Sequence, residues 1–224
     1  MHFIHSYSKN HLGVSFWLLT LTLMAFFIII IGGLTRLTNS GLSMVDWKPI
    51  MGTIPPLTNL AWVEVFNSYK ATPEFQIVNK SITLDEFKYI FWWEWIHRFF
   101  ARCIGIVFIL PLLYFWFKNK ISKRLLLTLV LVFVFGLFQA FIGWWMVKSG
   151  LIDNPYVSAY RLTFHLFNAL LIFCILFWST LNSFFEKNIK KDNNKIINIF
   201  FNTGLFFLFI TIISGGFMAG THSG

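Results

Sequence analysis

The stretch FWWEWIHRFFAR, residues 91–102, decides how this chain folds and where its chemistry lies. It is apolar enough to enter a bilayer, yet it carries Glu94, His97, Arg98 and Arg102 within about three helical turns. Ionisable side chains inside a membrane are costly and usually functional. The stretch therefore predicts a membrane helix that carries part of a functional site.

The composition of the whole chain supports a membrane protein. Of its 224 residues 57% are hydrophobic and 12% are charged, whereas a soluble domain carries about 25% charged residues. The net charge of +9 comes mostly from short loops between apolar runs, where basic residues act as topology signals. No glycine-rich phosphate loop, zinc-finger spacing or basic helix points to nucleic acid. Cys103 and Cys174 lie inside apolar runs without metal-ligand spacing, which predicts unpaired thiols.

Five apolar runs are long enough to cross about 30 Å of hydrocarbon as helices. They predict an all-α, polytopic membrane protein with a transmembrane four-helix bundle within residues 1–188 and a fifth helix within 189–224. The bundle carries a long outer loop, 35–89, in which NLAWVEVFNSYK has apolar residues at helical spacing. The predicted spans are 14–34, 90–117, 125–146, 160–181 and 198–218.

Loop charges predict the orientation of these spans. Lysine and arginine crowd the loops 118–124 and 187–195, whereas 147–159 holds little beyond Lys148. By the positive-inside rule the two basic loops and the N-terminus are cytoplasmic, and loop 35–89 is outside. The first span has no small-residue cleavage site and is predicted to stay uncleaved. We expect a multi-pass protein of the bacterial inner membrane.

Two glycine motifs suggest an internal repeat. GGLTRLTNSG, residues 32–41, ends the first span, and GGFMAGTHSG, residues 215–224, ends the fifth; five of the ten positions match. Paired glycines allow close helix packing in lipid, which would explain one such motif. Two motifs at the same topological place predict a duplicated four-helix unit. The fifth helix would then be the first helix of a truncated second repeat.

Two histidines lie at one predicted level of the bundle. The second and fourth spans both start at the outer face, and His97 and His165 each follow about two turns later, about 10 Å deep. In a four-helix bundle the two imidazoles can face each other across the core, as in bis-histidine haem ligation. The alternative is that each is a hydrogen-bonded structural residue, and the sequence leaves both interpretations open.

Four arginines are candidates for binding the propionates of a haem. Arg98 and Arg102 share a span with His97, while Arg161 and Arg36 lie at the outer ends of the fourth and first spans. Arginine pairs with carboxylates in a bidentate manner. The alternative is that the arginines only reach toward the interface. That alternative suits Arg161 and Arg36 better than Arg102, which lies deeper.

Two further polar residues lie within the predicted spans. Glu94 shares a helical flank with His97 and Arg98, so it could pair with Arg98 or serve as a proton acceptor beside a haem pocket. The sequence leaves both roles open. Gln139, in FGLFQAFIGWW, is expected to hydrogen-bond across helices rather than to reach a ligand.

At these positions the sequence resembles the haem A synthase family of proteobacteria and mitochondria. The resemblance implies eight transmembrane helices in two similar halves, and oxidation of a methyl group of haem O to the formyl group of haem A by two successive hydroxylations. It also implies that His97 and His165 ligate the substrate haem and that Glu94 takes part in the oxidation. The matching segments are GGLTRLTNSGLSMVDWKPIMGTIPP, EWIHRFFAR, QAFIGWWMVKSGL, YRLTFHL and GGFMAGTHSG.

Two departures from the family qualify this resemblance. The first outer loop has no cysteine pair, and the sequence holds only the first helix of the second half, where a haem b is expected. We therefore expect this chain to supply the substrate-haem half. Whether the chain is active by itself stays open.

The expected partners are haem O and the lipid bilayer, with haem O synthase, a separately encoded C-terminal half or a second copy as further candidates; the sequence does not identify the electron donor. A bis-histidine haem-binding module without catalysis and a small membrane transporter are the alternative functions.

Overall fold

The computed structural model describes residues 12–45, 51–152, 154–185 and 195–221, which form helices and connecting loops without an extended strand. Five helices are long and apolar enough to cross a membrane, judged by length and composition. The predicted all-α polytopic fold is confirmed. The five are α1 (Leu12–Leu37), α4 (Leu84–Phe117), α5 (Lys123–Gly150), α6 (Ala159–Phe184) and α7 (Lys195–Thr221).

Several features used in the sequence analysis lie outside the described residues. They are the N-terminal segment 1–11, most of the basic loop between α6 and α7, part of the first long loop at 46–50, and the end of the second glycine motif at 222–224.

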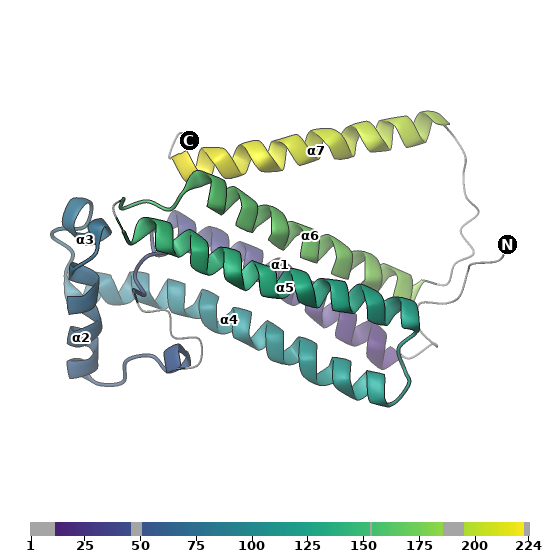
Figure 1. Ribbon diagram of the computed structural model, residues 1–224, viewed down its shortest axis with the longest axis horizontal. Coiled ribbons are helices and arrows are strands. Elements are labelled where there is room, and N and C mark those ends of the chain that lie inside the picture. The colour runs from purple at the N-terminus through teal and green to yellow at the C-terminus, as the bar shows by residue number, and fades with distance from the viewer. Residues whose placement is uncertain (1–11, 46–50, 153, 186–194, 222–224) are drawn as a thin grey trace.

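Helices α1, α4, α5 and α6 run side by side as a bundle (Figure 1). Helix α1 packs along both α4 and α6, and α6 packs along α5 and α7. Along their described lengths α4 and α5 have no comparably extensive contact. The bundle is therefore closed on three sides and less tightly packed between α4 and α5.

Helix α4 begins earlier than its apolar run. The helix starts at Leu84, before the predicted membrane span 90–117, because a capping box forms at Thr83, whose side chain accepts from the Glu86 N–H while the Glu86 carboxylate accepts from Thr83. With 34 residues the helix is about 50 Å long, which exceeds the hydrocarbon layer of about 30 Å. Its first turns therefore extend beyond the apolar layer.

Two short helices cover these first turns at one end of the bundle, which we call the loop end (Figure 1). The predicted helix in NLAWVEVFNSYK is confirmed as α2 (Asn59–Lys70). A short 3-10 turn (Met51–Thr53) precedes α2, and α3 (Pro73–Ile77) follows it. Thr58 and Thr72 cap the two helices with their side-chain oxygens. Their apolar faces bury a cluster, which we call the loop cluster, of Met44, Trp62, Phe66, Tyr69, Phe87, Ile90 and Phe91.

A second apolar cluster, the bundle core, fills the opposite half of the four helices. Trp17 at its centre also donates a hydrogen bond from Nε1 to the Val107 carbonyl at 2.8 Å. Neither cluster extends into the segment of the bundle that lies between them. The bundle core consists of Val14, Trp17, Leu18, Leu21, Ala25, Phe108, Leu125, Leu129, Val132 and Leu176.

Helix α7 attaches to the outside of the bundle through two glycines. A Cβ atom at Gly216 would lie 2.9 Å from Thr163 Oγ1, and one at Gly220 would collide with the backbone of Ala159. These two glycines are the buried residues of α7 within its described length. The second glycine motif therefore has a packing role, while the predicted division at 188/189 into two repeats stays a prediction.

Candidate functional site

The segment between the two clusters contains His97, which lies against a glycine of the neighbouring helix. A Cβ atom at Gly32 of α1 would be 3.4 Å from Nε2 of His97 on α4. The adjacent Gly33 has no such neighbour within 4 Å. Of the first glycine pair, Gly32 is thus the residue that faces the imidazole, at an ordinary van der Waals distance.

On the other side of the bundle, His165 also packs against a glycine of a neighbouring helix. A Cβ atom at Gly143 of α5 would be 3.0 Å from Cε1 and 3.6 Å from Nδ1 of His165 on α6. The Nδ1 atom is buried and has no hydrogen-bond partner among the described residues. Each histidine therefore packs against a glycine on an adjacent helix. Because glycine has no side chain, nothing on that helix has to move to admit the ring.

The two imidazoles occupy the same part of the interior. They are close enough to interact electrostatically, and each remains partly accessible. The described residues contain no group of three or more histidine, cysteine, aspartate or glutamate side chains that could hold a metal ion. A pair of imidazoles without further ligands suits the two axial positions of a haem iron, whose other ligands belong to the porphyrin.

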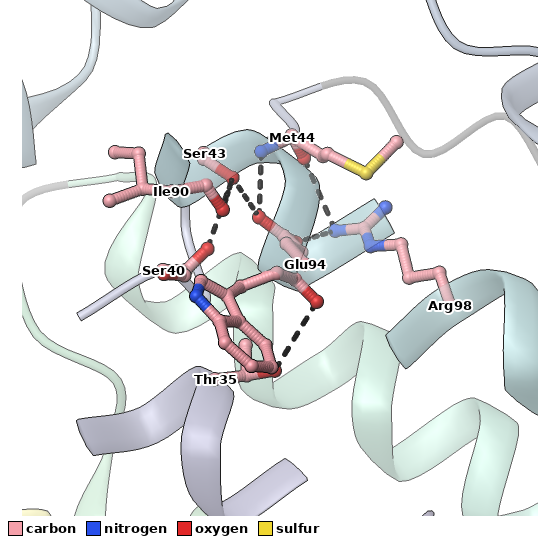
Figure 2. A network of polar contacts seen from close by, with 8 residues as sticks. Thr35, Ser40, Ser43, Met44, Ile90, Glu94 and Arg98 are labelled. Carbon is pink, nitrogen blue, oxygen red and sulfur yellow. Dashed lines mark hydrogen bonds and ion pairs between the residues drawn. The ribbon is translucent and has the colours of Figure 1, made fainter. Parts of the chain in front are cut away.

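Glu94 is the centre of a buried polar network at the loop end (Figure 2). The residue is 2% exposed. Its Oε2 accepts from Ser43 Oγ at 2.7 Å and from the Met44 N–H at 2.8 Å, and its Oε1 accepts from Arg98. Arg98 also donates to the Met44 carbonyl at 3.2 Å. The pairing of Glu94 with Arg98, one of the two roles that the sequence leaves open, is present, and the network ties the chain after α1 to α4.

Arg98 also lines a cavity of about 310 Å³ near the loop end. Arg102 follows one turn further along α4 on the same helical flank, and it is half-buried. With Lys148 the cavity wall carries two cationic side chains beside an apolar surface. The remaining lining residues are Met44, Val45, Trp144, Val147 and Leu151.

The other two candidate arginines contact neighbouring helices. Arg161 donates from Nη1 to the Trp145 carbonyl at 2.7 Å, and its guanidinium lies 4.2 Å from the centre of the Trp145 ring. Arg36 donates to the carbonyl of Ala219 on α7 and to Asn39 Oδ1. Their contribution to propionate binding stays a prediction.

The network around His165 includes a residue that the sequence analysis did not identify. Gln139 hydrogen-bonds across helices as expected, because its Nε2 donates to the His165 carbonyl at 3.2 Å. Asn168 in turn donates from Nδ2 to Gln139 Oε1 at 2.7 Å. An asparagine three residues after a histidine in an apolar run was the available signal, because both then share one helical flank. The roles of Gly143 and Ser43 required the folded structure.

Fold and site together define a multi-pass helical membrane protein with two histidines seated on glycines in the interior. Residues 15–224 match the sequence model of the COX15-CtaA family, described as cytochrome oxidase assembly protein. The chain belongs to this family.

Its curated relatives are named heme A synthase. The protein of Nitrosomonas eutropha is 44% identical over 97% of this chain and 62% of its own length. That of Rhizobium etli is 52% identical over 78% of this chain and 48% of its own length, and that of Flavobacterium psychrophilum is 43% identical over 96% and 64%. The chain thus spans less than two thirds of these relatives. No solved structure matches it.

Proposed function

We propose that this chain supplies the substrate-haem half of a haem A synthase, which oxidises a methyl group of haem O to a formyl group. The names of the relatives support a role in haem A biosynthesis. The observation that carries the proposal is the placement of His97 and His165 on glycine seats between two apolar clusters. A functional pair of imidazoles explains why this segment of the bundle lacks an apolar core.

The residues present fit a haem. A porphyrin is a flat, mainly apolar ring with two anionic propionates and two open axial positions on its iron. The two imidazoles match the axial positions. Arg98, Arg102 and Lys148 provide positive charge on the loop-end side, where propionates would pair with them. Because α4 and α5 pack less tightly than the other neighbouring helices, a flat ring can enter the bundle between them.

Within this proposal each residue has a separate task. His97 and His165 orient the haem ring, and Arg98 holds Glu94 in a fixed position beside it. An oxidant supplied from outside the described residues takes the two electrons of each methyl C–H bond that breaks, and Glu94 accepts the proton. The loop end faces the outside of a bacterial inner membrane and the N-terminus faces the cytoplasm.

The activity is tested in membranes that make haem O but not haem A. The chain is expressed alone and together with the C-terminal part of a relative, and the haems are extracted and separated by chromatography. We expect haem A when both parts are present. His97→Ala and His165→Ala should each abolish it, and undiminished haem A in either variant would contradict the proposal.

One observation favours a second function, a haem-binding module without catalysis. All the contacts of Glu94 are explained by its structural network, in which three donors hold the carboxylate. Under this alternative Glu94 stabilises the loop end and no more.

Glu94→Gln separates the two functions. The amide keeps the size of the side chain, so we expect retained haem binding and at least a hundredfold loss of haem A formation, as for general-base removal. A fully active Glu94→Gln protein would exclude the catalytic role. Ser43→Ala is the matched control, because it removes one donor from the carboxylate but leaves the acid in place.

A further inference from the structure

We propose that Gln139, held in place by Asn168, competes with iron for Nε2 of His165 and thereby makes His165 the releasable axial ligand of the haem pocket. The inference rests on the proposed function in taking His165 as a haem ligand. It concerns Gln139 on α5 and Asn168 on α6. Their hydrogen bonds form a chain from the Phe135 carbonyl to the His165 imidazole.

The orientation of Asn168 is set by the backbone. Its side chain is buried, and its amide nitrogen donates to the Phe135 carbonyl at 3.1 Å. A carbonyl oxygen can only accept a hydrogen bond, so the atom facing it must be the amide nitrogen. The same nitrogen donates its second hydrogen to Gln139 Oε1 at 2.7 Å.

The orientation of Gln139 follows from that of Asn168. Because Gln139 Oε1 accepts from Asn168, its amide nitrogen points toward His165. There it donates to the His165 carbonyl at 3.2 Å and lies 3.2 Å from the imidazole Nε2. An amide nitrogen offers only hydrogens, so Nε2 must accept, and the ring proton must be on Nδ1. The backbone carbonyls of Phe135 and His165 therefore fix the orientation of both side-chain amides.

The helix geometry supports the same contact. Gln139 and Gly143 are one turn apart on α5, and Asn168 and His165 are separated by three residues on α6, so each pair shares a flank. Gly143 lies nearest to Cε1 of the ring, while Gln139 contacts Nε2. Helix α5 thus holds the imidazole at two points.

This contact places the two histidines in different states. An imidazole nitrogen has a single lone pair in the ring plane, and Nε2 of His165 gives it either to the Gln139 amide or to iron. Among the described residues the imidazole of His97 has no hydrogen-bond partner that would compete in this way. His97 is therefore the permanent ligand, and His165 is the ligand that leaves when the substrate haem enters or departs.

The test measures ligand exchange on the purified chain reconstituted with haem B in detergent. Cyanide can bind the ferric haem only after one axial histidine leaves, so its binding rate reports that release. We compare the wild type with Gln139→Met, which has a similar length but no donor, and with Asn168→Leu, which frees the Gln139 amide. Gln76→Met changes an exposed glutamine of α3 and is the matched control.

We expect both variants to keep a six-coordinate, low-spin spectrum and to bind cyanide about fivefold more slowly, the factor for one net hydrogen bond. An unchanged or faster rate in Gln139→Met would overturn the inference. So would loss of the low-spin spectrum in both variants, because the pair would then only support His165. If His165→Ala left the spectrum of the wild type unchanged, the proposed haem ligation itself would fail.

Discussion

At the scale of single residues, each of the two histidines faces a glycine on a neighbouring helix. Gly143 leaves room for the imidazole of His165, because an added Cβ there would lie only 3.0 Å from Cε1. At Gly32 an added Cβ would be in ordinary van der Waals contact with His97, 3.4 Å from Nε2. Glycine in a helix interior is unfavourable by about 1 kcal/mol relative to alanine. The cost is offset if the ring must approach the backbone of the neighbouring helix.

A pair of valine substitutions on α5 tests this role. In Gly143→Val the new side chain would collide with the His165 ring, whereas Gly136 has no neighbour within 4 Å of an added Cβ. Overpacking costs about 1–3 kcal/mol, so we expect haem affinity to fall about tenfold or more in Gly143→Val. Gly136→Val should bind haem as the wild type does. Equal affinities in titrations of the two variants would contradict the role of Gly143.

At the scale of elements, the cap formed by α2 and α3 contains a buried acid outside the membrane. Glu74 accepts a hydrogen bond from the Tyr69 hydroxyl at 3.0 Å, and that hydroxyl accepts from Asn79 at 2.8 Å. Burial raises the pKa of Glu74 from 4.5 to about 7; the Tyr69 hydrogen bond opposes this shift, and the charge of Glu94 adds to it.

The raised pKa predicts how the stability of the cap depends on pH. Between about pH 4.5 and 7 the folded cap binds a proton at Glu74 that the unfolded chain has lost, so stability is greatest at the acid end. It decreases as pH rises through 7, by on the order of 3 kcal/mol. Glu74→Gln should remove this dependence, and Glu64→Gln, at an exposed site on α2, should keep it.

Limited proteolysis of the loop end at pH 5 and pH 8 measures this effect. Wild type and Glu64→Gln should be cleaved faster at pH 8, after correction for the protease rate on an unfolded substrate. Glu74→Gln should be cleaved at similar corrected rates at both values. A wild type equally resistant at both pH values would show that burial of Glu74 does not control the cap.

The attachment of α7 to α6 is a second feature at the scale of elements. Because an added Cβ at Gly220 meets the Ala159 backbone, Gly220→Val should separate α7 from α6 at the loop end, whereas Gly215→Val should not. Tyr160 and Phe217 are in ring contact across this interface, with centroids 5.1 Å apart. Cysteines at these two positions should be joined by a short thiol crosslinker in Gly215→Val but poorly in Gly220→Val.

That experiment requires a background in which Cys103 and Cys174, which are unpaired, are changed to serine. Equal crosslinking in the two valine variants would mean that α7 is held by contacts other than its glycines.

The elements also show what sequence can predict. The five long helices follow from uninterrupted apolar runs, and α2 follows from helical spacing. The polar first turns of α4 were not predicted as part of the helix, because the apolar run begins after them, although TLDE at 83–86 carries the capping-box pattern. The seat at Gly143 and the contact of Ser43 with Glu94 depend on which helix faces which, and that information exists only after packing.

At the scale of the whole molecule, two apolar clusters stabilise opposite ends of the bundle, and His97 and His165 lie between them. This division explains how a membrane bundle holds ionisable groups without losing its fold. The bundle core keeps the four helices together, and the loop cluster fixes the first turns of α4. Under the proposed function, the segment that contains His97 and His165 binds the planar ring of the haem.

The central claim is that these two histidines hold one haem between them. The most direct measurement is the absorption spectrum of the chain purified from membranes that make haem O, compared with His97→Ala and His165→Ala. We predict a six-coordinate, low-spin haem in the wild type and its loss in both variants. A wild type purified without haem, or variants with the spectrum of the wild type, would contradict the account.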